Sequence, residues 1–315
     1  MSAAPSQPAL GQSAFDGPPL GEAPLDRRAL GRALSRAADA GVADILDAPP
    51  RVGTRYARRI GVTGPPGAGK STLIAALARH RLERADRVAI VAIDPSSPKT
   101  QGSILGDRIR MDGLVDDPRV FIRSLASRGA TDGLADNLPE ILSVFDDYDF
   151  DEIILETVGV GQSEFAVRAL VDIELLVLIP GAGDQIQAMK AGILETADIY
   201  VVNKADQPGA RRVEAELKAT LALTTRSQEP PPVICVRADA GENIAALDHA
   251  IEALAVRKAS DAGAALRRRA CQRVKGLVWR RLAEVLEALP QSAFDQPLPA
   301  LYAALLEDLH QGKKR

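Results

Sequence analysis

The octapeptide GPPGAGKS at residues 64–71 constrains the fold of this chain more than any other feature of its sequence. It fits the pattern G-x-x-x-x-G-K-[ST], and it lies between the apolar run RRIGVTG and the helix-forming segment STLIAALARHRL. In this strand–loop–helix context, the pattern is typical of a phosphate-binding P-loop, because backbone N–H groups and the positive end of the helix face the phosphates. The sequence therefore predicts a P-loop fold that binds a nucleotide.

The P-loop residues have individual expected roles. Lys70 is expected to reach the β- and γ-phosphate oxygens, and the Ser71 hydroxyl is expected to coordinate Mg²⁺. The other residues expected to contact the nucleotide are Gly64, Pro65, Pro66, Gly67, Ala68, Gly69 and Thr72. The alternative, a glycine–proline loop that binds nothing, is disfavoured by the strand before it and the helix after it.

Short β-branched runs alternate with amphipathic segments along the middle of the chain. The seven runs are RRIGVTG, RVAIVAID, RVFIRS, EIILETV, IELLVLIPG, IYVVNKAD and PPVICVRAD. Such alternation indicates β–α units with parallel strands buried on both faces. The predicted fold class is α/β, a P-loop NTPase with a mostly parallel, roughly seven-stranded sheet flanked by helices.

The tetrapeptide NKAD at 203–206 follows the sixth run, at the edge of the sheet where ligands bind in such folds. Asp206 can accept hydrogen bonds from the N1–H and exocyclic amine of guanine, a pair of donors that adenine lacks. Asn203 is expected to contact the other edge of the base, and the stem of Lys204 is expected to cover its face. After a P-loop, this tetrapeptide predicts that the chain binds GTP and GDP, whereas alone it could be an ordinary loop.

The loop CVRADAGENI follows the seventh run and is expected to close over the base through backbone groups near Ala238 and Asp239. Many GTPases carry a Ser-Ala pair at this point. This chain instead carries Arg237 before Ala238.

Three carboxylates are candidates for a magnesium site and for catalysis. Glu156 ends the fourth run within ETVG, where many GTPases have the aspartate of D-x-x-G, and Asp94 ends the second run. Asp107 lies in the polar segment SPKTQGSILGDRIRM and could move toward the metal. These acids are expected to bind Mg²⁺ together with Ser71, while Gly159 offers its N–H to the γ-phosphate. For each acid, the alternative is a helix N-cap or a solvated loop charge.

Composition and charge argue against several classes of function. The net charge of −3 disfavours a nucleic-acid-binding surface. No apolar run approaches the roughly 18 residues of a membrane span, and the N-terminus lacks the pattern of a secretory signal. Cys235 and Cys271 lie far apart in apolar surroundings, so both are expected to be reduced core residues of a cytoplasmic protein.

The chain divides into four predicted parts. They are a disordered tail at 1–25, an N-terminal helical extension at 26–56, a G domain at 57–258 and a C-terminal helical arm at 259–315. Asp26 is a candidate N-cap for the first helical unit. The arm contains a long amphipathic helix at 264–289 and a shorter helix around 297–309, which need the domain or another subunit to pack on.

Several strings of the sequence resemble the MeaB/ArgK family of GTPases, which includes the mitochondrial MMAA type. The strings are GPPGAGKS, AIDPSSPKTQGSILGDRIRM, ETVGVGQSE, PGAGDQIQAMKAGILE and VVNKAD, and the resemblance covers roughly residues 26–285. It implies a G domain of the SIMIBI class with helical extensions, and a homodimer joined by the C-terminal arm. It also implies association with an adenosylcobalamin-dependent acyl-CoA mutase.

The resemblance assigns a role to the stretch PGAGDQIQAMK, which in this family acts as an extra switch that couples the nucleotide state to the mutase. The switch candidates here are Asp184, Gln187 and Lys190. Lys190 would pair with Glu156 or with the nucleotide phosphates when the mutase is bound, adding positive charge where phosphoryl transfer develops negative charge. The alternative for Lys190 is an exposed helix lysine.

The implied function is a slow GTPase, stimulated by its partner, that gates cobalamin loading and protects or reactivates the mutase. The mutase is methylmalonyl-CoA mutase or a relative, and a cobalamin adenosyltransferase is a second candidate partner; neither nucleic acid nor a membrane is expected as a partner. One alternative is a metal-delivering GTPase metallochaperone, which would need a cluster of Cys or His residues that this sequence lacks. A less favoured alternative is a P-loop kinase, which the P-loop alone would permit.

Overall fold

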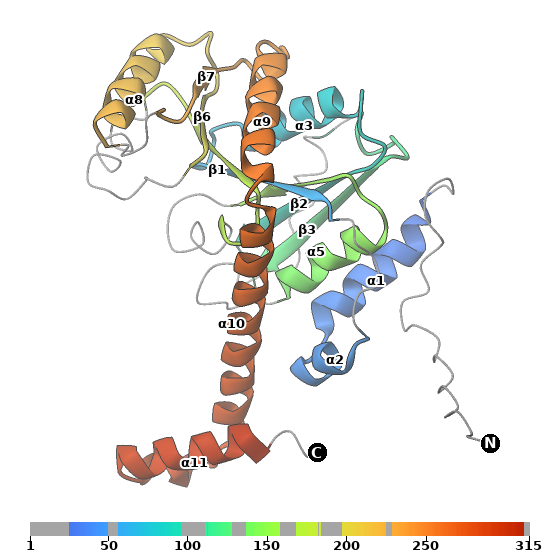
Figure 1. Cartoon of the computed structure of the whole chain (residues 1–315), viewed down its shortest axis with the longest axis vertical. Coiled ribbons are helices and arrows are strands. Elements are labelled where there is room, and N and C mark those ends of the chain that lie inside the picture. The colour runs from blue at the N-terminus through green and yellow to red at the C-terminus, as the bar shows by residue number, and fades with distance from the viewer. Residues whose placement is uncertain are drawn as a thin grey trace, which may run out of the picture.

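The computed structural model describes residues 25–49, 56–95, 111, 113–127, 137–157, 168–181, 183, 197–224 and 229–311. A sheet of seven parallel strands lies at its centre, in the order β3-β2-β4-β1-β5-β6-β7 (Figure 1). The strands are β1 Arg58–Thr63, β2 Val88–Pro95, β3 Val120–Ser127, β4 Glu152–Glu156, β5 Ile173–Leu178, β6 Ile199–Val202 and β7 Val233–Cys235. Each of the seven predicted runs forms one of these strands, which confirms the predicted fold class.

Helices cover both faces of the sheet. On one face lie α3 (Lys70–Arg81) and α9 (Ile244–Ala259); on the other lie α1 (Arg27–Asp39), α5 (Leu138–Asp147) and α8 (Ala210–Thr224). Alternate side chains of one strand enter different cores: in β2, Ile90 packs in the core beneath α3 and α9, and Val91 packs in the core beneath α1 and α5. Burial on both faces explains why the strands are continuous apolar runs.

The N-terminal helical unit is interrupted, whereas the sequence predicts no break. The carboxylate of Asp26 accepts hydrogen bonds from the N–H groups of Arg28 and Ala29, each 2.9 Å long, so the predicted N-cap is confirmed. After α1, the N–H of Gly41 donates to the Asp44 carboxylate at 2.9 Å, and a second helix, α2 (Val42–Asp47), begins. Gly41 and Asp44 thus form a start signal for a second helix within the predicted unit.

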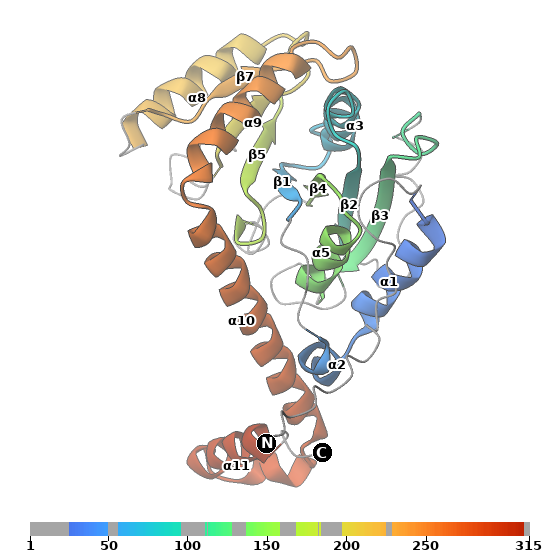
Figure 2. The same ribbon diagram turned by 45° about the vertical axis from the view of Figure 1, so that its right-hand side comes forward.

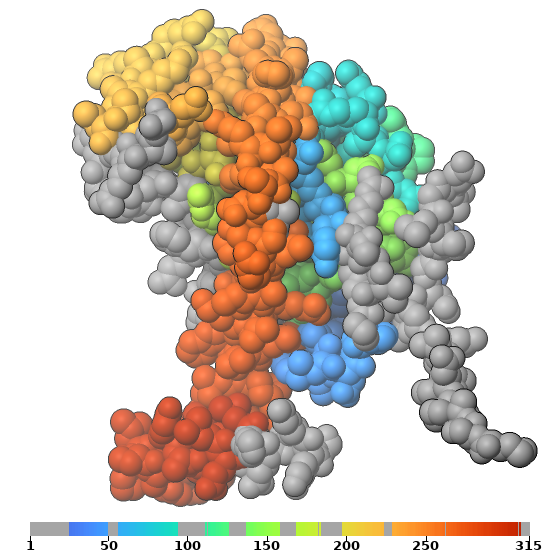
Figure 3. Space-filling model, in the orientation of Figure 1, coloured from blue at the N-terminus to red at the C-terminus, as the bar shows by residue number. Residues whose placement is uncertain are grey.

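The C-terminal arm extends away from the sheet, as Figures 2 and 3 show. It consists of α10 (Ala262–Ala288), the 3₁₀ turn Gln291–Asp295 and α11 (Leu298–Gln311), which confirms both predicted helices. The contacts of α10 with the body include several from arginines: Arg273 Nε donates to Glu140 at 2.8 Å, and Arg280 donates to the carbonyl of Ala40 at 2.7 Å. Among the described residues, no helix combines the length and apolarity that crossing a bilayer requires.

The expectation that both cysteines lie in the core is wrong for Cys271. Cys235 is half-buried at the end of β7, but Cys271 is exposed on α10. The apolar neighbours of Cys271 in the sequence belong to a helix that lies on the surface of the molecule, so they do not bury it.

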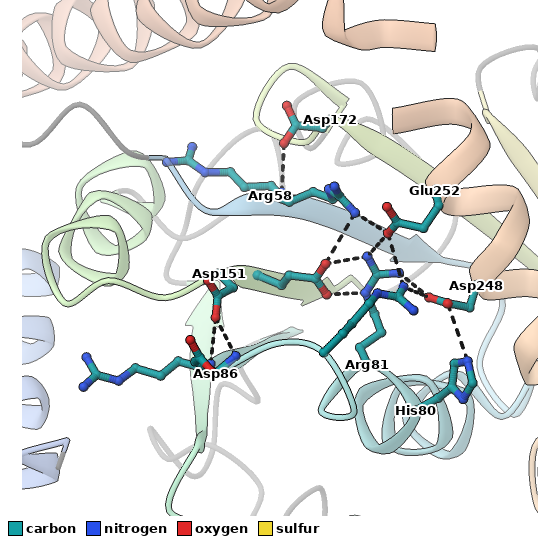
Figure 4. A network of polar contacts seen from close by, with 12 residues as sticks. Arg58, His80, Arg81, Asp86, Asp151, Asp172, Asp248 and Glu252 are labelled. Carbon is teal, nitrogen blue, oxygen red and sulfur yellow. Dashed lines mark hydrogen bonds and ion pairs between the residues drawn. The ribbon is translucent and has the colours of Figure 1, made fainter. Parts of the chain in front are cut away.

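A network of charges fixes the C-terminal end of α3 at the amino edge of the sheet (Figure 4). Arg81 is fully buried and donates to Glu152, which begins β4, and to Asp248 and Glu252 of α9. Its Nη2 lies 2.7 Å from Glu252 Oε1, and Arg58 at the start of β1 lies 3.5 Å from Glu152. The helix that follows the P-loop is therefore held to two strands and to α9 at its far end.

Candidate nucleotide-binding site

The P-loop runs from the end of β1 to the start of α3 at the carboxyl edge of the sheet, and at two of its glycines an added Cβ would clash with a neighbouring strand or loop. Gly64 has φ of 146°, and a Cβ there would lie 2.3 Å from the carbonyl oxygen of Val177. Gly69 has φ of 80°, and a Cβ there would lie 2.5 Å from Asn203 Nδ2. Any larger residue would clash with β5 or with loop 203–206, which the sequence predicts to be the guanine-recognition loop.

Lys70 lies against the P-loop that precedes it. Its Nζ donates to the carbonyls of Gly64 at 2.9 Å and Pro65 at 3.2 Å, and the residue is only 8% exposed. A buried ammonium needs such acceptors because desolvation of the charge is costly. The arrangement places a cation inside the loop whose N–H groups and helix end favour anions.

The hydroxyl of Ser71 donates to Glu156 Oε1 across 3.0 Å, joining the first turn of α3 to the end of β4. The pairing of β4 with β1 brings Glu156 opposite Val62, two residues before the P-loop. The residues present fit a magnesium ion, since a hydroxyl and a carboxylate oxygen are ligands that Mg²⁺ prefers. Asp94 belongs to the adjacent strand β2, but its side chain lies outside the described part of the structure.

Asn203 joins the P-loop to the guanine-recognition loop. Its Nδ2 donates to the carbonyls of Ala68 at 2.9 Å and Gly69 at 3.4 Å, and its Oδ1 accepts from the N–H groups of Lys204 at 2.8 Å and Ala238 at 3.2 Å. The residue is 2% exposed. All four hydrogen-bonding positions of the amide are therefore used within the protein, a bridging role that the sequence interpretation did not include. The contact of Asn203 with the edge of the base stays a prediction.

Lys204 and Asp206 lie on the accessible side of the same loop. Lys204 has φ of 55°, and its Nζ donates to the carbonyl of Gly67 at 3.0 Å, so its side chain spans the gap to the P-loop. The Asp206 side chain is 49% exposed, and its Oδ1 lies 3.9 Å from Nε of Arg237. A carboxylate with this exposure remains able to accept the two N–H donors of guanine.

The structure brings together Lys70, Ser71, Glu156, Asn203, Lys204, Asp206 and Ala238 at one edge of the sheet. Asp107, Gly159, Asp184, Gln187 and Lys190 lie outside the described residues. The sequence analysis did not predict two features of the site. One is the bridging role of Asn203, for which the motif gives no signal. The other is the position of Arg237 beside Asp206, for which the arginine in place of the usual serine was a signal. No group of three or more His, Cys, Asp or Glu side chains that could hold a metal occurs within the described ranges.

The family described as "Methylmalonyl Co-A mutase-associated GTPase MeaB" matches residues 35–293 of this sequence. The chain belongs to the MeaB family. The matched region begins within α1 and ends just after α10, so it contains the P-loop, the guanine-recognition loop and every predicted site residue.

Relatives of this MeaB-family chain differ in how much of their length they share with it. A Pyrococcus abyssi protein named as a GTPase is 46% identical over 189 residues, which make up 59% of this chain and 58% of the relative. A Caulobacter vibrioides protein named as a GTPase is 40% identical over 296 residues, or 90% of this chain and 87% of the relative. The mouse protein named "Methylmalonic aciduria type A homolog, mitochondrial" is 42% identical over 191 residues, or 59% and 46%. The chain thus spans about half of the mouse relative's length.

The crystal structure described as LAO/AO transport system kinase shares the fold with a TM-score of 0.60 and 24% sequence identity. The match covers 92% of this chain and 99% of that one.

Proposed function

We propose that this MeaB-family chain hydrolyses GTP and uses the cycle to gate adenosylcobalamin loading of a cobalamin-dependent acyl-CoA mutase, which it also protects or reactivates. The observation that carries the GTPase assignment is the link from the P-loop, through the buried amide of Asn203, to the loop that contains Asp206. The mutase assignment is supported by the family description and by the name of the mouse relative. The partner is methylmalonyl-CoA mutase or a close relative.

The side chains of the site have separate tasks in this proposal. Asp206 binds the N1–H and amine of guanine, and Lys70 contacts the β- and γ-phosphates. Ser71 and Glu156 would hold Mg²⁺, and Asp94 and Asp107, whose side chains lie outside the described residues, would be further ligands. The ion would neutralise charge that develops on the phosphates during transfer.

The segments that respond to the partner are proposed from the sequence. Gly159 contacts the γ-phosphate, and Asp184, Gln187 and Lys190 couple the nucleotide state to the mutase. Because a partner must place these groups, hydrolysis by the chain alone is expected to be slow. The protein is proposed to act in the cytoplasm as a homodimer joined by the C-terminal arm, with a cobalamin adenosyltransferase as a further partner.

GTP turnover by the purified chain tests the proposal, measured alone and with candidate cobalamin-dependent mutases. Lys70→Ala serves as the inactive control, because it removes the cation from the P-loop. Strong stimulation of the wild type by one mutase would identify the partner. Tight GTP binding without stimulation by any mutase would retain the nucleotide site and overturn the mutase assignment.

A further inference from the structure

Arg237 stands where many GTPases have serine, and its guanidinium is surrounded by three carboxylates. Its Nε lies 3.3 Å from Asp239 Oδ1 and 3.9 Å from Asp206 Oδ1, and its Nη1 lies 3.5 Å from Glu242 Oε1. Asp206 is the residue proposed to bind guanine, and the other two acids belong to the loop after β7. The Arg237 guanidinium therefore lies between three carboxylates, beside the proposed binding site of the guanine base.

The backbone that carries Arg237 is held in place by hydrogen bonds. Its N–H donates to the Glu242 carbonyl at 3.2 Å, and its own carbonyl accepts from the Glu242 N–H at 3.1 Å. The next residue, Ala238, donates its N–H to the side chain of Asn203 at 3.2 Å. The guanidinium thus extends from a fixed point that is connected to the guanine-recognition loop itself.

The Nε–H group of Arg237 is shielded from solvent and makes no hydrogen bond within the described part of the chain. A buried donor without an acceptor costs free energy, so a small rotation that brings it onto a carboxylate is favoured. The carboxylates of Asp206 and Asp239 are the ones closest to this group. Asp239 is the nearer of the two, so such a rotation brings Nε onto Asp239 and leaves the oxygens of Asp206 free to accept from a ligand.

The separation of 3.9 Å also leaves the Asp206 carboxylate open to a ligand. Guanine needs both carboxylate oxygens, one for N1–H and one for its amine, so the orientation of the group matters. An arginine that attracts the carboxylate from the side, without a direct hydrogen bond, restricts its rotation and leaves its acceptors available.

We propose that Arg237 is a positioning residue for guanine recognition, whose guanidinium holds the Asp206 carboxylate in the orientation that accepts both donors of the base. The inference rests on the proposed binding of guanine nucleotides. It gives a reason for the Arg-Ala pair at this position of the chain, and it makes this loop part of the specificity of the site.

Calorimetric titration of the full chain with GDP and with IDP, which lacks the exocyclic amine, tests the role of Arg237. Arg237→Ala is expected to weaken GDP binding by about threefold to fivefold, as for the loss of an exposed ion pair, and to weaken IDP binding less. The GDP/IDP affinity ratio therefore falls. Arg237→Lys is expected to restore part of the ratio, because it keeps the charge but loses the planar geometry.

The matched control is Arg257→Ala, which removes an exposed arginine of α9 that pairs with Glu229 at 2.8 Å, and it should leave the ratio unchanged. Equal weakening of GDP and IDP by Arg237→Ala would overturn the inference, because it would indicate a loop-stabilising role only. Tighter GDP binding by that variant would also overturn it, since Arg237 would then compete with the base. A wild-type chain that fails to bind GDP would instead contradict the proposed function.

Discussion

At the scale of single residues, Asn203 and Gly69 depend on one another. The amide of Asn203 fills the space that a Cβ on Gly69 would need, and it donates to the Gly69 carbonyl. The bond from the same amide to Ala68 brings the P-loop and the guanine-recognition loop into contact before either meets a ligand. A site arranged in advance pays less ordering entropy when it binds.

Asn203→Ala is expected to destabilise the fold by about 2 kcal/mol, because it leaves buried N–H and carbonyl groups without partners. The variant should also bind GDP more weakly, since the two loops are no longer joined. Urea denaturation and GDP titration check these effects. Arg212→Ala, which removes one exposed ion pair with Glu216 at 2.8 Å on α8, is the control and should cost less; equal losses would contradict the bridging role.

Gly69→Ala and Gly67→Ala form a matched pair. Both glycines have positive φ, 80° and 78°, so each alanine meets backbone strain of about 1–2 kcal/mol. Only Gly69 has a neighbour within contact distance of the added Cβ, at 2.5 Å from Asn203 Nδ2. GDP affinity measured by titration should therefore fall much further, by roughly tenfold or more, in Gly69→Ala than in Gly67→Ala. Indistinguishable affinities would show that the close approach to Asn203 is unimportant.

At the scale of elements, hydrophobic runs identify strands and helices, but they do not determine which elements lie next to each other in the fold. The seven runs were sufficient to predict the seven strands, because strands buried on both faces are continuously apolar. The strand order, with β4 between β2 and β1, depends on crossovers that no run specifies. The same limit applies to Arg81 and its acidic partners: Glu152 and Asp248 are remote in sequence and meet only through the packing of α3, β4 and α9. The same holds for Asn203 in the candidate site. The NKAD motif identifies this residue as functional, but it does not predict which groups of the P-loop its amide contacts.

Glu152→Gln is expected to destabilise the protein by roughly 3 kcal/mol, because it removes one charge from a buried pair and leaves the Arg81 guanidinium under-compensated. Urea denaturation measures the change. Glu229→Gln, at a side chain that is 79% exposed and pairs with Arg257, is the control and should change the free energy of unfolding by less than about 1 kcal/mol. If Glu152→Gln lowered the free energy of unfolding no more than the control does, the network would make no net contribution to stability.

The two carboxylates of α9 in this network, Asp248 and Glu252, have lowered pKa values, from which we predict that acid destabilises the fold. Burial alone would raise the pKa of Asp248, but the hydrogen bond from Arg84 and the nearby arginine charges outweigh it, and the pKa is lowered. The pKa of Glu252 is lowered in the same way, against burial, by Arg58 and Arg81. Because both pKa values are lower in the folded state, the stability these groups contribute is present above their unfolded values.

That stability is lost as pH falls through the folded pKa values, so the free energy of unfolding should decline below about pH 4. Urea denaturation at several pH values measures the slope. Asp248→Asn should be less stable near neutral pH and should show a shallower decline in acid, because it no longer titrates at this position. A slope identical to the wild type would mean that Asp248 does not contribute to the linkage.

At the scale of the whole molecule, the C-terminal arm combines polar contacts to the body with an uncovered apolar surface. The exposed apolar side chains on α10 and α11 include Val274, Val278, Trp279, Tyr302 and Leu306. In Figures 1 and 2 the arm projects beyond the sheet with α11 at its tip. Apolar patches of this kind are typical of surfaces that associate, which supports the proposed homodimer.

Trp279→Glu is expected to shift the protein from dimer to monomer, because it places a charge on an apolar side chain that is 69% exposed on the arm. Light scattering coupled to size-exclusion chromatography gives the mass of each species. The control is Leu223→Glu, at an even more exposed position on α8, which should leave the mass unchanged. A wild-type chain that elutes as a monomer would contradict the proposed role of the arm.

The buried charges around Arg81 also restrict how related sequences can diverge. Removing one member strands an opposite charge in the interior, whereas replacing the whole set with apolar residues of similar volume can be nearly neutral. Among related sequences, Arg81, Glu152 and Asp248 should therefore be replaced together, and sequences in which only one of the three is replaced should be rare. Lineages would then carry either the full ionic set or a fully apolar replacement behind the same P-loop.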